Sequence, residues 1–187
     1  AYCGKIKHAV ERAGMPIQEY QSKEVFDLTE STFQVEEGTG KMSAKVRIIS
    51  AGRSKNKRNY RESALQGAVT KGLFNGVRMF VNHSTTPPLK RSLTDMVSAI
   101  EATHYDDAAK AIDADVVFFN KDFIEYVQRA KDYMGDSINA LVRGTRIKEP
   151  SGFVEEDIHE FVQPHSVDWV IYPAAGGQIL AFESEGE

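Results

Sequence analysis

Hydrophobic and polar residues alternate with a period of two in several short segments of the chain, which indicates β-strands with one apolar face. The segment 44–50 alternates most clearly, and 96–105 and 109–119 alternate on either side of Asp106-Asp107, as in a hairpin. The same pattern predicts further strands at 25–28, 33–35, 77–83, 137–142, 157–162 and 166–172, with Pro164 separating the last two.

Two segments show instead the spacing of an amphipathic helix. The first is 60–73, for which Asn59 and Glu62 have the spacing of a capping box, and the second is 121–134, which Asn120 can cap. Strands do not alternate regularly with these helices, which argues against a doubly wound parallel sheet. The pattern therefore predicts an α+β fold, with a mostly antiparallel curved sheet or barrel flanked by helices.

The length of 187 residues suits one domain, and 41% hydrophobic residues are ordinary for a soluble globular protein. The net charge of −4 gives no global reason to expect nucleic-acid binding, and the basic run 53–58 is interpreted as a solvated loop. Cys3 is the single cysteine, and no apolar run approaches the ~18 residues of a membrane span. We therefore expect a protein of a reducing cytosol that partners neither nucleic acid nor membrane.

Ser137 and His83 are the candidates for a nucleophile and its base. Gly135 is expected to end the second helix, which places Ser137 at the mouth of the next strand, on the face opposite Ile138. His83 ends the apolar strand 77–83, and two strand ends can bring a hydroxyl and an imidazole together. The alternative is that Ser137 is an ordinary strand-start serine and His83 a loop residue, and spacing alone favours this alternative.

Other catalytic chemistries find less support. His159-Glu160 begins like a metalloprotease helix, but Gln163 stands where that motif needs its second histidine. Gly176-Gly177 is too short to cradle a nucleotide phosphate, and Cys3 has no base near it in sequence. We therefore expect no metal and no cofactor, which leaves serine chemistry or no chemistry.

The order of several short motifs between about residues 46 and 177 resembles the prohead (capsid maturation) proteases of tailed bacteriophages. The motifs are Ile48-Ile49-Ser50-Ala51-Gly52, Phe80-Val81-Asn82-His83, Ser92-Leu93-Thr94-Asp95-Met96-Val97, Asp136-Ser137-Ile138-Asn139-Ala140, Ser166-Val167-Asp168-Trp169-Val170 and Pro173-Ala174-Ala175-Gly176-Gly177. That family is related in fold to the herpesvirus assemblins. The resemblance therefore implies an assemblin-like, curved sheet surrounded by helices.

The resemblance implies a serine endopeptidase packaged inside the procapsid, in the host cytoplasm. Its substrates would be the scaffold protein and the major capsid protein, and often the protease itself, during head maturation. A homo-oligomer is compatible with this role. The alternative from another class is a catalytically inactive structural or scaffold-associated head protein of the same fold, and a metal-dependent hydrolase is a weaker third hypothesis.

The resemblance also assigns roles to residues. Ser137 would be the nucleophile and His83 the base, at a separation that is typical of the family. Asp168 is the expected third member that orients the imidazole, with Glu160 second and His165 third.

The surroundings of these residues carry further expectations. Arg143 and Gly144 would lie in the oxyanion region, as an arginine-bearing stretch does after the nucleophile strand of the assemblins. The loop 84–95, whose prolines and charges suggest an exposed segment, would border the substrate cleft. Asp136 departs from the family, in which many members have leucine or glycine before the nucleophile.

Residues 41–182 are expected to form the protease domain. Residues 1–40 would be an N-terminal extension packed on that domain or leading into it, and 183–187 an acidic tail or linker. Because the family commonly processes itself, the tail is expected to continue into a further segment of the gene product, with Glu187 near a self-cleavage point.

Overall fold

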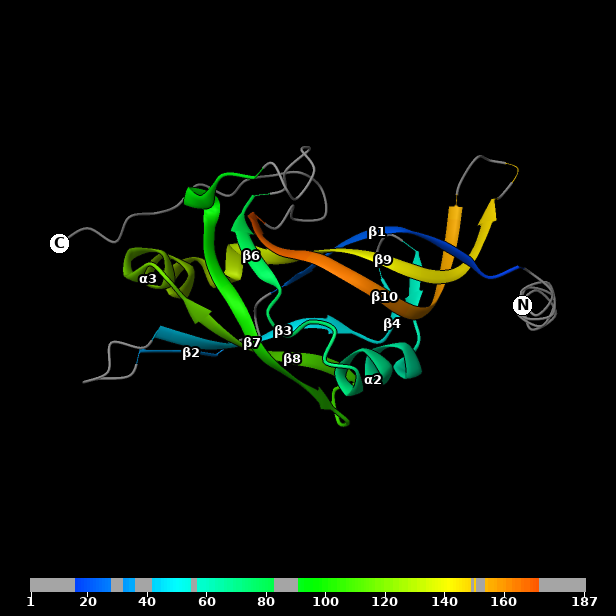
Figure 1. Cartoon of the computed structure of the whole chain (residues 1–187), viewed down its shortest axis with the longest axis horizontal. Coiled ribbons are helices and arrows are strands. Elements are labelled where there is room, and N and C mark those ends of the chain that lie inside the picture. The colour runs from blue at the N-terminus through cyan, green and yellow to red at the C-terminus, as the bar shows by residue number, and fades with distance from the viewer. Residues whose placement is uncertain are drawn as a thin grey trace.

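The computed structural model describes residues 16–27, 32–35, 42–54, 57–82, 91–148, 150 and 154–171. These residues form one curled, half-barrel sheet with two α-helices (Figure 1). The first strands are β1 (Gln18–Asp27), β2 (Thr32–Val35), β3 (Met42–Ser50), β4 (Gly52–Arg53) and β5 (Arg58–Tyr60). Then come α2 (Glu62–Thr70), β6 (Arg78–Val81), the 3-10 helix η2 (Leu93–Asp95), β7 (Met96–Asp106) and β8 (Ala111–Phe118). The last described elements are α3 (Lys121–Ala130), the 3-10 helix η3 (Lys131–Tyr133), β9 (Met134–Lys148) and β10 (Val154–Ile171).

The strands lie in the order β1-β9-β10-β6-β7-β8-β3-β2, and β5 pairs with both β10 and β4. Figure 1 shows β1, β9 and β10 as long ribbons that cross the molecule together. β9 and β10 pair over nearly their full length, from Met134 opposite Ile171 to Lys148 opposite Val154. This pair therefore forms the spine of the sheet, with β1 paired on one side and β5 and β6 on the other.

The α+β class and the curved sheet are confirmed, but the antiparallel description is only partly right. β10 runs parallel to both β5 and β6, whereas it runs antiparallel to β9. The sheet is mixed because the last strand of the described chain inserts between β9 and β6 instead of adding to an edge.

Both helices form where the spacing predicts them, although only one has the predicted cap. The side chain of Asn120 accepts a hydrogen bond from the backbone N–H of Phe123 at 3.2 Å and so caps α3. Asn59 does not cap α2, whose N-cap is Arg61, because Asn59 lies in β5. Its amide donates to Asp157 across the sheet at 2.8 Å instead.

The junction before Ser137 differs from the prediction. α3 ends at Ala130 and β9 begins at Met134, so Gly135 is a strand residue and does not end the helix. Ser137 consequently lies inside the strand, with an exposed fraction of 0%, and not at an open strand mouth.

Pro164 does not separate two strands. β10 is continuous from Val154 to Ile171, and its pairing with β9 shifts register on both sides of Pro164. Such bulges allow an antiparallel strand to accommodate a residue without an N–H donor.

The core fills the inside of the curled sheet and contains two aromatic groups. Trp169 packs against Phe118 and Phe123, with ring centroids at 5.4 and 6.0 Å, and its indole N–H donates to Ser98 at 2.8 Å. Further along β10, Phe161 packs against Tyr60 and Phe74. One group packs against α3 and the other against the chain on both sides of α2, so each helix covers one part of the sheet.

At the far end of β10, three consecutive carboxylates are buried: Glu155, Glu156 and Asp157. The basic run around residue 53 supplies partners for two of them, because Arg58 donates to Glu156 at 2.6 Å and Arg53 lies 3.0 Å from Glu155. The described part of this run is therefore an ion-pair partner of the strand and not simply a solvated loop. None of the helices in the described ranges is long and apolar enough to cross a membrane.

Candidate active site

Ser137 and Asp168 face each other across the spine of the sheet. They are register partners in the antiparallel pair of β9 and β10, so their side chains project from the same face of the sheet. Both are buried, with exposed fractions of 0% for Ser137 and 1% for Asp168. The structure therefore brings together the candidate nucleophile and the favoured third member of the triad.

Arg91 is the ionic partner of Asp168. Its Nη1 donates to Oδ1 of Asp168 at 2.8 Å, and the two side chains are only 5% and 2% exposed. The guanidinium carbon also lies 4.0 Å from the ring centroid of Phe80, which is the register partner of Asp168 on β6. The carboxylate that faces Ser137 is thus held by a buried cation.

The same guanidinium holds the end of β6. Nη2 of Arg91 donates to the carbonyl of Asn82 at 2.7 Å, while the N–H of Asn82 donates to the carbonyl of Trp169 at 2.8 Å. Asn82 has a φ of 63°, a left-handed conformation that asparagine tolerates and that turns the chain out of the strand. The next residue is His83, which lies outside the described residues, as do 84–90 of the loop.

Asp136 points to the other face of β9. Trp169 is its register partner, and the Asp136 side chain has an exposed fraction of 0%. Neighbouring strand residues project to opposite faces, so this carboxylate lies on the core side and Ser137 on the other. The departure from the family pattern is therefore a buried residue beside the candidate nucleophile, with its side chain directed away from it.

The structure does not bring Glu160, Arg143 or Gly144 to Ser137. Glu160 accepts from Lys71 at 2.6 Å and from Arg143 at 3.1 Å, and the hydrogen bond from Lys71 lowers the pKa of Glu160 below its usual value. Arg143 follows Ser137 by six residues along β9, roughly 20 Å at ~3.3 Å per residue. That separation is too long for either oxyanion candidate to hydrogen-bond an oxyanion at Ser137.

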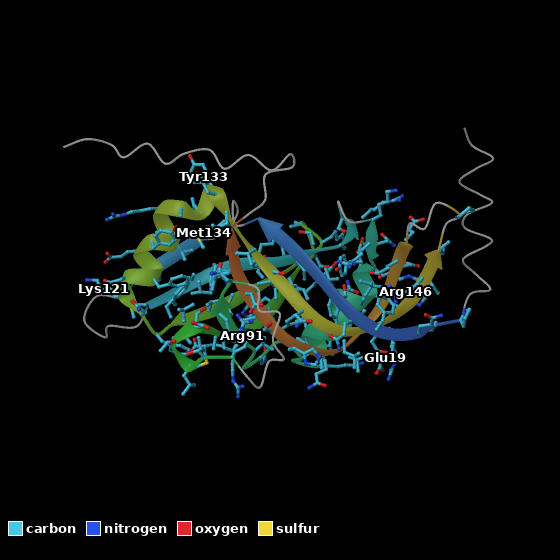
Figure 2. The ribbon with its side chains drawn as sticks, turned by 90° about the horizontal axis from the view of Figure 1, so that it is seen from above. Glu19, Arg91, Lys121, Tyr133, Met134 and Arg146 are labelled. Atoms are coloured by element: carbon cyan, nitrogen blue, oxygen red, sulfur yellow. The ribbon has the colours of Figure 1, made fainter. Side chains whose placement is uncertain are left out.

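Figure 2 agrees with this separation: Arg91 and Met134 lie in one half of the molecule, and Glu19 and Arg146 in the other. Glu19 is the second partner of Arg143, at 3.3 Å. A cavity of about 300 Å³ in that second half is lined by Ile17, Ser63, Ala64, Gly67, Lys71, Arg143, His159 and Glu160. Neither Ser137 nor Asp168 lines it.

His165 also lies apart from the Ser137–Asp168 pair. It sits at the register shift between Pro164 and Ser166, and its Nε2 is 3.3 Å from the amide nitrogen of Gln21 on β1. Gln21 pairs with Leu141, four residues along β9 from Ser137. Of the three candidates for the third position, Asp168 is thus the one that faces the serine.

A metal-dependent mechanism would need a cluster of side chains that can bind a metal ion. Within residues 16–27, 32–35, 42–54, 57–82, 91–148, 150 and 154–171, no group of three or more His, Cys, Asp or Glu side chains could hold a metal ion. Cys3 and the acidic tail 183–187 lie outside these ranges.

The fold of the chain resembles that of a solved structure. The chain is similar to the capsid assembly protease gp21 of bacteriophage T4, with a TM-score of 0.58 and 16% sequence identity, over 84% of this chain and 99% of that one. This chain has the fold of a phage capsid assembly protease. The resemblance predicted from the motif order is therefore confirmed in the fold, which the identity is too low to extend to single residues. No family model and no curated protein matches the sequence.

Sequence reasoning missed Arg91 in this capsid assembly protease fold. It stands in a polar loop with two prolines, a composition that predicts exposure, and yet its side chain is 5% exposed. Its partner Asp168 is 77 positions away in the sequence. A single arginine gives no periodic signal, and the one signal in the sequence is that Asp168 needs a partner once it is buried.

Proposed function

We propose that this chain is a serine endopeptidase that acts inside a phage procapsid in the host cytoplasm and cleaves scaffold and capsid proteins, and itself, during head maturation. The observation that carries the proposal is the buried register pair of Ser137 and Asp168, within a fold shared with a capsid assembly protease. The end of β6 supports it, because the chain leaves Asn82, next to Trp169, directly into His83.

In this mechanism His83 accepts the proton of the Ser137 hydroxyl as its oxygen attacks the scissile carbonyl. The imidazolium then donates that proton to the leaving amine, and a water molecule hydrolyses the acyl-enzyme by the same route. Asp168 orients the imidazole and stabilises its charged form. Backbone N–H groups near Ser137 are proposed for the oxyanion, because Arg143 and Gly144 lie too far along β9.

The test is Ser137→Ala, assayed by cleavage of procapsid scaffold and capsid proteins. We expect loss of cleavage, since the nucleophile is removed, and a destabilisation of only about 1 kcal/mol from the lost buried hydroxyl. Ser98→Ala is the matched control: Ser98 is also buried, but it bonds the indole of Trp169 on the core side. It should lose similar stability and keep its cleavage rate.

The competing function is an inactive structural head protein of the same fold. Full burial of the Ser137 side chain favours it, since a peptide bond must reach that oxygen. Labelling with a serine-directed phosphonate and peptide mapping separates the two functions. Label on Ser137 together with cleavage supports the enzyme, whereas a folded chain that neither reacts nor cleaves, or a Ser137→Ala variant that still cleaves, would overturn it.

A further inference from the structure

Arg91 is buried more deeply than the other ion-paired arginines that the structure describes. Its side chain is 5% exposed, against 18% for Arg47 and 21% for Arg58, the next lowest. Burial of a guanidinium is costly unless each of its faces and edges finds a partner. Nη1 and Nη2 of Arg91 find acceptors and its flat face finds an aromatic ring, whereas Nε has no hydrogen-bond partner among the described residues. The three closest contacts indicate its role, and a longer one runs from Nη2 to the carbonyl of Val81 at 3.5 Å.

The first contact is ionic: Nη1 of Arg91 donates to Oδ1 of Asp168 at 2.8 Å. This bond fixes the carboxylate on the face of the sheet that it shares with Ser137. A planar guanidinium fork has a fixed direction for each N–H, so it restricts the carboxylate in both position and angle.

The second contact is to the backbone, where Nη2 donates to the carbonyl of Asn82 at 2.7 Å. That carbonyl belongs to the peptide group that joins Asn82 to residue 83, and a peptide group is planar. The N–H of Asn82 is held at the same time by Trp169. One guanidinium thus connects the carboxylate opposite Ser137 to the exit of β6.

The third contact, with the ring of Phe80, holds the guanidinium group in one orientation. The guanidinium lies over the ring of Phe80, 4.0 Å from its centroid, and Phe80 is the register partner of Asp168. Stacking of a guanidinium on an aromatic face restricts rotation of the group. A lysine ammonium, which is a point charge, cannot reproduce this stacking together with both hydrogen bonds.

We propose that Arg91 is a positioning residue of the active site: it sets the Asp168 carboxylate and the carbonyl of Asn82 relative to Ser137. This inference rests on the proposed function. Arg91 itself touches no reacting atom, so its loss should lower kcat and leave KM nearly unchanged.

The experiment compares Arg91→Lys and Arg91→Ala with Arg47→Ala as the control. Arg47 is also a partly buried arginine with two carboxylate partners, Asp106 and Asp113, but it lies on β3, away from Ser137. We expect kcat to fall roughly 100-fold in both Arg91 variants, as for an active site misplaced by about 1 Å, with KM within about twofold. Arg91→Lys keeps the positive charge beside Asp168, so it serves if Arg91→Ala does not fold.

Two further measurements exclude a purely structural role. Guanidinium ions at a non-denaturing concentration should restore several-fold activity to Arg91→Ala, while sodium at equal ionic strength restores none. The imidazole NMR resonances of His83, assigned with His83→Gln, should move in Arg91→Lys and not in Arg47→Ala. The NMR measurement does not depend on catalysis. An inactive wild type would therefore overturn the proposed function, while the His83 resonances would still test the positioning role of Arg91. Unmoved His83 resonances, or a kcat within twofold of the Arg47→Ala control, would overturn the inference.

Discussion

Gly144→Ala tests whether this glycine has a structural role in the β9–β10 spine. A Cβ built on Gly144 overlaps the carbonyl oxygen of Asp157 and lies 2.9 Å from the hydroxyl of Tyr20 and 3.1 Å from the carbonyl carbon of Asp157. Gly144 pairs with Ile158 on one side and Gln18 on the other, so backbone surrounds it in the sheet. A backbone carbonyl cannot rotate away as a flexible side chain can, so the two strands have to move apart.

The magnitude follows from that displacement. Overpacking a filled site costs roughly 1–3 kcal/mol, and each hydrogen bond lost from the strand ladder adds about 1 kcal/mol. We therefore expect the free energy of unfolding to fall by about 3 kcal/mol, which for a chain of this size lowers Tm by roughly 6–12 °C.

The measurement is urea unfolding followed by circular dichroism, with a thermal scan beside it. Gly67→Ala is the control, because nothing lies within 4 Å of a Cβ at Gly67, and the residue is inside helix α2. Alanine should stabilise that helix by roughly 0.5–1 kcal/mol, since glycine has the greater conformational entropy to lose. The two glycine-to-alanine changes are thus expected to have opposite signs.

Gly144→Ala with a free energy of unfolding within about 0.5 kcal/mol of wild type would refute the reasoning. The variant also bears on the oxyanion prediction. Since Gly144 lies seven residues from Ser137 along β9, the folded variant should keep the kcat of the wild type. Loss of turnover in a folded Gly144→Ala variant would instead support a role for this glycine in the active site.

Two predictions concern buried carboxylates. Asp168→Asn should cost about 3–5 kcal/mol of stability, because it leaves the buried Arg91 charge unpaired; urea unfolding measures this, and a near-neutral effect would contradict the ion pair. Burial raises the pKa of Asp157, but hydrogen bonds from Arg61 and Asn59 outweigh it and hold the pKa below its usual value. A folded-state pKa below the unfolded one of about 3.9 gives stability that is present above that pH and lost as pH falls through the folded value. The Tm difference between wild type and Asp157→Asn should therefore shrink in acid, and an equal difference at pH 3 and pH 7 would count against this.

The sequence by itself determined the elements whose causes are local. The strands β7 and β8 form from alternating residues on either side of a short turn, and α3 forms on an apolar stripe behind the Asn120 cap. Each of these needs only neighbours a few positions away. The motif order added the resemblance to the prohead proteases, which the fold confirms.

Long-range partners decided the places where the local pattern was misleading. Asn59 has the spacing of a helix cap, yet it lies in β5 and bonds Asp157, 98 positions later in the chain. Pro164 has the character of a strand breaker, yet β10 continues because register shifts beside it absorb the missing donor. In both cases a contact across the sheet outweighed a local preference, because pairing with another strand satisfies more backbone groups than a cap or a turn.

The candidate site likewise combines features that follow from the local sequence with features that only long-range contacts decide. The sequence supplied Ser137 and Asp168 as residues of two strands, each with its face given by alternation. A strand that shifts by two residues along its neighbour keeps the same side chains on the same face. Alternation therefore gives the face of each residue but not which residues of the two strands stand opposite each other. The register of β9 on β10, set over the whole paired length and by its bulges, places Asp168 opposite Ser137 and leaves Glu160 opposite Arg143. Only the tertiary structure then buries Arg91 against Asp168 and the end of β6, because that contact joins three segments that are far apart in the chain.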